Sequence, residues 1–561
     1  MPVPAIGVSA PGHLAAHLGE LTRYLPPELV DDVLTRTHTV QKRLRLLPSR
    51  TGVYFVLALA LFPGLGYARV WAKLSAGVSV SEKALRDLRR RLGPAPLAML
   101  FDIVAGPLAQ PRTPGVSFAG MRTVAFDGLN SLKIPDSDRN RSWIGRIYYR
   151  LAYAGYPTLR ILCLVETGTR GLLGAVIGGA IGTPGDRAES LLATRLLDRL
   201  HCGMLLLADR AYDSAPLMAA VTATGAKLLI RGSAVRKPPV LEILADGSYL
   251  SVLAGVPVRI IEAHISVRGA DGAQMSELYR LITTLHDPRR FPADVLTRLY
   301  HERWEIEVAF LALRHSMLDA HVLRSHDRPG VEQEVWALLT VYQLLRTAMV
   351  EAIETDPRLD PDRAGFTTAL NAARDSVIAT RTGIGPDHIE LDDGVALVGG
   401  VGRAVLATLL PPRRMRYSNR RLKSPRSRFR TRDEDRPTVS TAILGIDITV
   451  SVPEAVDQLP EPETRGRDTE RFTHGRPPQP PRPPRPVIPT RRQLVVEILE
   501  ADPDRSWSGA ELADKLGIPR RNMLTQLAEW TRLGFMHRSG AGRYALPGPL
   551  LRMALDLGRS T

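Results

Sequence analysis

The sequence predicts a multidomain α/β protein, and three observations support this fold class. The chain has 561 residues, more than one compact hydrophobic core usually holds, so three or four domains are expected. Its hydrophobic content of 44% is ordinary for a globular protein. Short apolar runs typical of strands alternate with stretches of helical periodicity, and a Pro-rich segment precedes a last small module.

The charge balance indicates a polyanionic partner. The chain carries 74 Lys and Arg against 58 Asp and Glu, a formal net charge of +16, and its pI is about 10.1. A strongly basic globular protein favours nucleic acid before membrane as its partner.

Location is predicted from what the sequence lacks. The longest apolar run, residues 53–62, is far shorter than the roughly 20 residues that span a bilayer, so we expect a buried helix. The first residues lack the basic start and apolar block of a signal peptide. Cys163 and Cys202 form no metal-binding spacing, fit a reducing cytoplasm and are expected in the core. The sequence therefore predicts a cytoplasmic protein without membrane segments.

Residues 14–105 are expected to form a helical N-terminal domain. Its clearest helix is VSVSEKALRDLRRRLG, where Ser79 and Glu82 have capping-box spacing and Gly93 is a natural stop. Its leucines share one face, whereas Arg86 and Arg89 fall largely on other faces and are predicted to contact DNA phosphates. A solvated basic face on a packing helix is the alternative.

Residues 118–350 are expected to form an α/β domain. The apolar runs TVAF, TLRILCLVE and GLLGAVIGGAI precede a helical segment at 187–200 and the run MLLLA. Three strands, a helix and a further strand is the order of a domain built like ribonuclease H, although other α/β folds fit the pattern nearly as well. A β-rich insertion is expected at about 225–290, from LEILADGSYLSVL, VPVRIIEAHISV and LYRLITTL.

Three segments follow this domain. Residues 351–436 are expected to be helical and basic; their run RRMRYSNRRLKSPRSRFRTR is interpreted as a phosphate contact, with a solvated tail as the alternative. Residues 459–489 are a Pro-rich linker. Residues 490–550 show the order of a winged helix, with Arg520 and Arg521 at the start of the recognition helix. A winged helix used for protein contacts remains open.

Two aspartates follow apolar runs in the α/β domain. Asp127 follows TVAF and precedes Gly128, and Asp209 follows MLLLA and precedes Arg210. Both are expected at the C-terminal ends of strands, where open α/β sheets bind ligands. Singly each is weak evidence, because Asp after a strand is also a common turn or helix cap.

The segment LYHERWEIEVAFLALRHSM supplies a third acid. On a regular helix, spacings of three, four and seven residues bring four side chains to one face: Tyr300, Arg303, Glu307 and Arg314. An apolar stripe is expected opposite them: Ile306, Phe310, Leu313 and Met317. From spacing alone, a salt-bridged surface helix remains open.

This helix resembles the Tyr, Arg, Glu, Lys motif of the insertion-sequence-four family of DDE transposases, with Glu307 as the third acid. The resemblance extends to DGLNSLKIPDS after Asp127, ADRAYDS around Asp209 and LYRLITTLHDPRRFPADVLTRLYHERWEIE before the motif. It covers roughly residues 14–430 and implies a ribonuclease H-like catalytic core with a β insertion. The linker and the winged-helix module lie outside it.

Two positions depart from the family pattern. The family's Lys is Arg314 here, a cation that still suits phosphate but prefers a flatter, bidentate contact. Some relatives hold a flipped base on a Trp in the β insertion, but no Trp lies between Asp209 and Trp304. Tyr249 and Tyr279 are only loose substitutes for it.

The resemblance implies a two-metal mechanism. Asp127, Asp209 and Glu307 would bind two Mg²⁺ ions, with Mn²⁺ able to substitute, and Asp127 would bridge them. Tyr300, Arg303 and Arg314 would hold DNA phosphates.

The resemblance also implies partners and a pathway. It indicates cut-and-paste movement through a hairpin on the transposon end, by a homodimer acting on double-stranded terminal repeats and target DNA. The location would be the bacterial cytoplasm, at the nucleoid when DNA is bound. Two alternatives remain: a ribonuclease H-like nuclease without strand transfer, and a catalytically silent DNA-binding protein.

Overall fold

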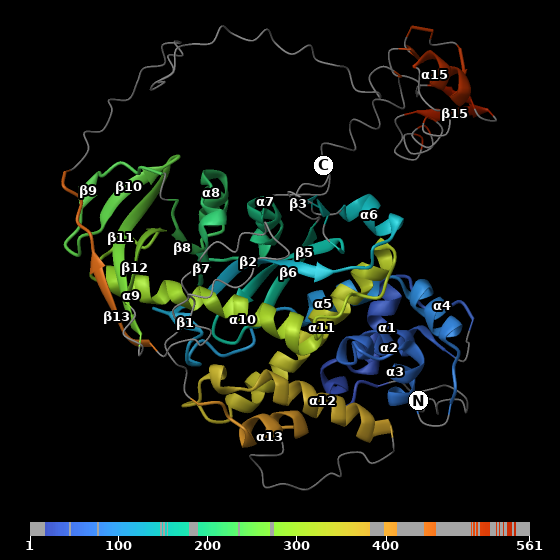
Figure 1. Cartoon of the computed structure of the whole chain (residues 1–561), viewed down its shortest axis with the longest axis horizontal. Coiled ribbons are helices and arrows are strands. Elements are labelled where there is room, and N and C mark those ends of the chain that lie inside the picture. Colours follow the sequence, from blue (N-terminus) through green and yellow to red (C-terminus); the bar gives the residue numbers. More distant parts are fainter. Residues whose placement is uncertain are drawn as a thin grey trace, which may run out of the picture. The chain divides into compact units, whose positions relative to one another are not determined.

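The computed structural model divides the chain into two compact units, Met1–Pro462 and Glu463–Thr561, and Figure 1 labels their helices and strands. In the first unit it describes residues 17–43, 47–75, 78–145, 148–149, 152–153, 155–178, 189–233, 236–269, 274–381, 398–411 and 443–455. In the second unit it describes residues 495, 498–499, 501–502, 505–516, 523, 527, 531, 536–540 and 543–545. The basic run at 413–432 and the linker at 459–489 lie outside these ranges.

Eleven described strands of the first unit form one mixed sheet, so the observed class is α/β as predicted. The strand order is β6-β5-β2-β7-β8-β12-β11-β10-β9, with β1 beside β2 and β13 beside β11. The bounds are β1 Ser117–Phe118, β2 Met121–Lys133, β5 Thr158–Glu166, β6 Leu172–Gly178, β7 Met204–Ala208, β8 Lys227–Arg231, β9 Glu242–Ile243, β10 Tyr249–Leu253, β11 Val256–Gly269, β12 Gln274–Thr283 and β13 Ile443–Val450. A separate pair comprises β3 Tyr148–Tyr149 and β4 Ala152–Tyr153.

The first half of this sheet follows the predicted sequence of elements. β2, β5 and β6 pair antiparallel, and after a helical segment β7 returns beside β2 in parallel. β8 then pairs in parallel with β7. The runs that form β5 and β7 are almost continuously apolar because these strands are buried on both faces.

The predicted β insertion extends this same sheet. β12 pairs antiparallel with β8, and β11, β10 and β9 continue outward from it. β13, which the sequence analysis did not identify, pairs with β11 from far along the chain. Its alternate residues Ile446, Ile448 and Val450 pack against the core.

Helices cover both faces of the sheet. Figure 1 shows α7 and α8 on one side and α9, α10 and α11 on the other, and each side has its own hydrophobic core. The described helices are η1 Leu21–Tyr24, α1 Pro27–Arg36, α2 Ser49–Leu61, α3 Tyr67–Leu74, α4 Glu82–Leu92, α5 Ala95–Val104, α6 Asp138–Ile144, α7 Glu189–Ala193, η2 Thr194–Arg199, η3 Arg210–Tyr212, α8 Ala215–Ala223, α9 Ala293–Tyr300, η4 His301–Trp304, α10 Glu305–Leu311, η5 Ala312–Met317, α11 Arg328–Ile353, η6 Pro361–Arg363, α12 Phe366–Arg381 and α13 Gly400–Ala407.

The long helix α11 joins the N-terminal helices to the rest of the unit. It packs against α2, α5, α12 and α13, and its buried residues share one hydrophobic core with the N-terminal helices. The apolar run at 53–62 lies in α2 and is buried as expected. Among the described residues, no helix is long and apolar enough to cross a membrane.

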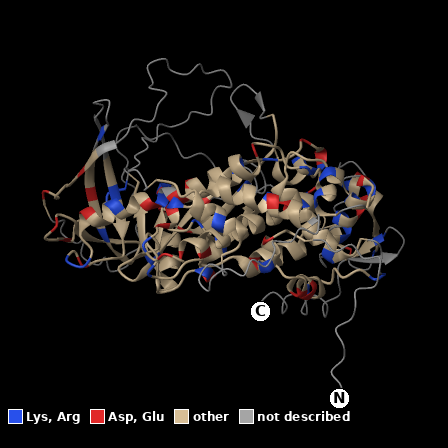
Figure 2. Ribbon diagram, turned by 90° about the horizontal axis from the view of Figure 1, so that it is seen from below, with Lys and Arg blue, Asp and Glu red and all other residues tan. Residues whose placement is uncertain are grey.

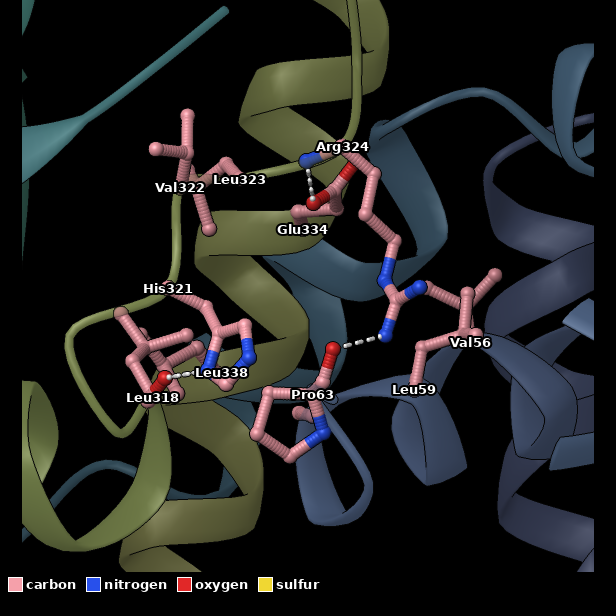
Figure 3. A pocket seen from close by; sticks show the side chains of 11 residues that line it. Val56, Leu59, Pro63, Leu318, His321, Val322, Leu323, Arg324, Glu334 and Leu338 are labelled. Carbon is pink, nitrogen blue, oxygen red and sulfur yellow. Dashed lines mark hydrogen bonds between the residues drawn. The ribbon is translucent and has the colours of Figure 1, made fainter. Parts of the chain in front are cut away.

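Polar contacts also connect α11 with the N-terminal helices. Figure 3 shows Arg324 donating to the carbonyl oxygen of Pro63 at the end of α2, and Glu334 of α11 accepting from the Arg324 main chain. The distances are 2.5 Å and 2.8 Å. The adjoining cavity of about 30 Å³ has room for water and not for a substrate.

Two local expectations were wrong. The N-cap of α4 is Ser81, whose side chain accepts from Ala84 N at 3.2 Å, and not Ser79. The expected stop at Gly93 is present, with φ +67°. Cys163 is buried in β5, but Cys202 is exposed because it lies in the turn before β7.

The second unit contains a small sheet of β14 Trp507–Ser508, β16 Arg543–Ala545 and β15 His537–Gly540, with α15 Gly509–Lys515. The expected capping box of Ser508 and Glu511 is present at α15. The hairpin expected in FMHRSGAGRYAL is present as β15 and β16. Arg520 and Arg521 lie outside the described residues, so the winged helix stays a prediction.

Candidate active site

Asp127 and Asp209 lie at the same level where two parallel strands separate. The pairing of β2 with β7 runs from Arg122 and Met204 to Ala125 and Leu207. The same register, continued two residues further, places Asp127 beside Asp209. Asp127 was expected at a strand end, but β2 continues beyond it because β5 still pairs with it, at Cys163.

Main-chain hydrogen bonds orient both aspartates. Asp127 Oδ1 accepts from the Gly128 N–H at 2.8 Å. Asp209 Oδ1 accepts from the Ala211 N–H at 2.7 Å and thereby caps η3. The capping role considered for a lone Asp therefore coexists with a place beside Asp127.

The segment that carries Glu307 is irregular. It consists of α9, the 3-10 turn η4, α10 and the π-helix η5, so the single regular helix assumed from the spacing was wrong. The four apolar residues of the expected stripe are all buried. Tyr300 and Arg303 are also buried, whereas Glu307 and Arg314 are half-buried.

Arg303 is the cation among the three acids. Its Nη1 lies 3.7 Å from Asp127 Oδ2, and its charge also interacts with Asp209 and Glu307. Burial opposes the charge of Arg303, but Tyr300 and the three carboxylates more than offset this, so its pKa is raised. The structure therefore brings Asp127, Asp209 and Glu307 together around one guanidinium.

Asp127 has an unusual affinity for its proton. Its pKa is raised to about 7, mainly by burial; Glu307 and Asp209 also raise it, whereas Arg303 and the Gly128 N–H lower it. Crowded carboxylates of this kind are frequent at functional sites.

The Tyr300 ring packs against the Arg303 guanidinium. The Arg303 guanidinium lies 5.9 Å from the centre of the Tyr300 ring, and that ring meets Tyr279 edge-on at 6.1 Å. Burial raises the pKa of Tyr300 to about 12, so its hydroxyl stays protonated. Tyr279 and Tyr249 are 5% and 3% exposed, so in this structure neither offers a ring on which a base could stack.

Arg314 lies on η5, and π-helical turns often occur at functional sites. It lines an open groove of about 170 Å³ together with Lys133, His315 and His321. Among the described residues, no acidic side chain lines this groove. The groove therefore suits a phosphate.

Of the two predicted DNA contacts in the N-terminal helices, one is exposed and the other is buried. The Arg86 side chain is exposed, but the prediction for Arg89 was wrong, because its guanidinium is buried in an ion pair with Glu334 at 3.0 Å. Figure 2 shows basic and acidic residues intermixed along the described ribbon. The densest basic run, residues 413–432, is outside that description.

Sequence reasoning missed Glu189, at the start of α7. Its Oε1 accepts from Asn130 Nδ2 at 2.8 Å, and Tyr212 OH lies 3.5 Å from its Oε2. Asn130 and Tyr212 each follow a predicted acid by three residues, which is the one signal that the sequence offered. Glu189 itself follows no recognisable pattern.

The donor set fits a hard divalent cation. In the described part of the chain, no three His, Cys, Asp or Glu side chains already lie close enough to hold one ion together. Carboxylate oxygens are nevertheless the hard ligands that Mg²⁺ binds, with water and phosphate oxygens completing its coordination. Glu307 and Asp209 add to the effect of burial in raising the pKa of Asp127, and Arg303 opposes them.

Two known protein families match this chain, one over the N-terminal helices and one over the domain that holds the acids. Residues 15–102 match the family described as insertion element 4 transposase N-terminal. Residues 121–344, which hold all three acids, match the family described as transposase DDE domain.

Individual proteins are also similar. The transposase InsG for insertion sequence element IS4 of Escherichia coli (strain K12) is 26% identical over 416 residues, covering 71% of this chain and 90% of that protein. The putative transposase InsZ of the same strain is 24% identical over 205 residues, covering 36% and 67%. A piggyBac transposase synaptic complex with hairpin DNA has a TM-score of 0.37 at 11% identity, covering 72% of this chain and 87% of that one.

Proposed function

The chain belongs to the insertion-sequence-four family of DDE transposases, and from this premise we propose that it moves DNA by cut-and-paste transposition at Asp127, Asp209 and Glu307. The observation that carries the assignment is the gathering of these three acids, from three separate elements, around Arg303. Each acid also occupies the position that the family motif gives it in the sequence.

The proposed core is ribonuclease H-like. The strand order β6-β5-β2-β7-β8, with three antiparallel strands and two parallel additions, supports this. Asp127 lies on the central strand and Asp209 directly follows its parallel neighbour. Glu307 comes from α10, which packs on β2.

Transposases with a DDE domain depend on divalent metal, and we propose two Mg²⁺ ions here, with Mn²⁺ able to substitute. Bound ions would activate the attacking oxygen and stabilise the leaving oxygen of the phosphodiester. Asp127, Asp209 and Glu307 would hold them through carboxylate oxygens.

Several basic residues are proposed to position DNA. Arg314 would contact a backbone phosphate from its groove. Arg303 would contact DNA after leaving Asp127, and Tyr300 would support its guanidinium. Arg86 remains a proposed contact, as do Arg520 and Arg521 of the proposed winged helix.

The proposed partners are double-stranded terminal repeats and target DNA. A homodimer in which each subunit binds one end and cuts the other, and a hairpin intermediate, follow from the family resemblance. We place this reaction in the bacterial cytoplasm, at the nucleoid.

The test is cleavage and strand transfer of labelled DNA that carries the flanking element's terminal repeats, with Mg²⁺ or Mn²⁺. Asp127→Ala, Asp209→Ala and Glu307→Ala should each bind the DNA and fail to cut it. Asp198→Ala is the matched control, because the Asp198 side chain is 73% exposed on η2, and it should cut normally.

Other outcomes separate the alternatives. Cutting without a joined product would indicate a nuclease. Binding without any cutting by the intact protein would indicate a silent DNA-binding protein. Normal cutting by any one of the three variants would refute the triad.

A further inference from the structure

The carboxylate of Glu189 occupies space next to Asp127 that only a glycine leaves open. A Cβ atom on Gly128 would lie 2.7 Å from Glu189 Oε1 and 2.9 Å from its carboxyl carbon. Real Cβ atoms essentially never approach another atom this closely. The glycine after Asp127 therefore admits the Glu189 carboxylate against β2.

Glu189 joins the two segments that carry the aspartates. One carboxylate oxygen accepts from Asn130 Nδ2 at 2.8 Å, and the other lies 3.5 Å from Tyr212 OH. Asn130 follows Asp127 by three residues, and Tyr212 follows Asp209 by three. A single side chain thus contacts equivalent positions beyond both acids.

The contacts of Glu189 with Asn130 and Tyr212, here called the Glu189 bridge, are held in one geometry by neighbouring groups. Arg160 Nε donates to Asn130 Oδ1 at 2.7 Å, which turns the Asn130 amide nitrogen toward Glu189, and it lies 4.0 Å from Glu189 Oε1. The Tyr212 ring is fully buried and stacks on Phe126 with centroids 5.9 Å apart. Both ends of the bridge are therefore fixed.

The bridge lies where main-chain pairing ends. The hydrogen-bonded ladder between β2 and β7 stops at Ala125 and Leu207, two residues before each aspartate. Beyond that point no pairing between β2 and β7 holds the two aspartates at a fixed spacing. Glu189 contacts both sides of this gap.

We propose that Glu189 is a positioning residue that sets the spacing of Asp127 and Asp209 through Asn130 and Tyr212. This inference rests on the proposed function, because the spacing matters for holding divalent cations. Groups behind metal ligands typically contribute about 10- to 100-fold to metal affinity or activity. DNA binding should depend little on Glu189, since the proposed phosphate contacts lie on other elements.

The test uses the full chain with uncut terminal-repeat DNA. Mn²⁺ binding is followed by electron paramagnetic resonance, and DNA affinity, cleavage rate and melting temperature are measured in parallel. Glu189→Ala should weaken Mn²⁺ binding and slow cleavage by about 10- to 100-fold, with unchanged DNA affinity. Gly128→Ala should act in the same direction by displacing the carboxylate.

Glu189→Gln distinguishes positioning from direct metal contact. Its amide oxygen can still accept from Asn130 and its nitrogen can donate to the Tyr212 oxygen, so it should recover most of the Mn²⁺ affinity. Glu262→Gln is the matched control, because Glu262 is likewise a partly buried acid that accepts from two side chains, Tyr249 at 3.2 Å and Arg280 at 2.7 Å. It lies on β11 and should behave like the wild type.

The possible results either support or overturn the proposed role of Glu189. Wild-type Mn²⁺ binding by Glu189→Ala would overturn it, and if the intact protein still cleaves, the proposed function stands. A Gln variant as impaired as the Ala variant would replace positioning by direct metal contact. If the Ala variant unfolds, Gly128→Ala decides, and wild-type Mn²⁺ binding by that variant would overturn the inference. An intact protein that binds no Mn²⁺ would refute both proposals.

Discussion

Substituting Asp127 by Asn should stabilise the metal-free protein while abolishing cleavage. Only 13% of the Asp127 side chain is exposed, and burial, with Glu307 and Asp209 nearby, raises its pKa from 3.8 to about 7. The negative charge is therefore unfavourable in the folded state. Asn keeps an oxygen that can accept from Gly128, and Arg303 keeps its interactions with the other two acids.

The sign and size of the effect follow from proton linkage. Because the folded pKa is raised, the folded state binds the proton more tightly than the unfolded state. The destabilisation is absent below pH 3.8, grows between 3.8 and about 7, and is complete above this window. At 1.36 kcal/mol for each unit, it amounts to about 2 kcal/mol near pH 5 and about 4 kcal/mol near pH 8.

The assay is the melting temperature of the first unit's transition, measured in chelator at both pH values. With an unfolding entropy of about 2.1 cal/mol/K per residue, this unit changes stability by roughly 1 kcal/mol per degree. Asp127→Asn should therefore melt roughly 2 °C higher near pH 5 and roughly 4 °C higher near pH 8. Asp138→Asn, at a fully exposed side chain, should change neither value.

The reasoning fails if the gain from Asp127→Asn does not grow with pH. A destabilised variant at the higher pH would show that the ion pair with Arg303 outweighs the burial of the charge. Equal gains at both pH values would indicate a packing effect and not an electrostatic one.

Three further predictions concern other parts of the molecule. Arg89→Met should reduce stability by about 3–5 kcal/mol, because Glu334 stays buried without its partner, and leave the salt dependence of DNA binding unchanged; an altered salt dependence at a normal melting temperature would contradict this. Arg314→Lys should retain binding to transposon ends, whereas Arg314→Ala should reduce the salt slope by about one ion, measured by fluorescence anisotropy; equal binding by both variants would refute the phosphate contact. Truncation after residue 462 should preserve the melting temperature of the first unit, whereas truncation after residue 442 removes β13, exposes the edge of β11 and should lower it; equal melting temperatures would refute a stabilising role for β13.

The sequence predicted the elements that burial defines. TLRILCLVE and MLLLA coincide with β5 and β7 because strands covered on both faces need continuous apolar side chains. It did not predict β13, since that strand pairs with a partner about 180 residues earlier and gains its burial only from that pairing. Local pattern alone cannot supply such a contact.

In the candidate site, too, residues with a local sequence signal were predicted and those that depend on distant contacts were not. Asp127 and Asp209 follow apolar runs, and the resemblance identified Glu307, so these residues could be named without coordinates. The burial of Arg89 could not, because its partner Glu334 lies on α11, far along the chain. Glu189 was missed for the same reason: its meaning depends on Gly128, Asn130 and Tyr212 meeting around it.

The position of Arg303 links DNA binding to metal binding. Within the described chain the acids do not yet form a metal-binding group, and Arg303 lies 3.7 Å from Asp127. A DNA phosphate that draws Arg303 away would leave the carboxylates with unbalanced charge and raise their affinity for a cation. Linkage makes this reciprocal, so Mn²⁺ should bind more tightly with terminal-repeat DNA present, and the DNA more tightly with Mn²⁺.

Calorimetric titration of Mn²⁺ with and without DNA measures this coupling in the wild type and in Arg303→Ala. In that variant Mn²⁺ should bind well without DNA, and the coupling should shrink; undiminished coupling would show that Arg303 does not exchange between Asp127 and DNA.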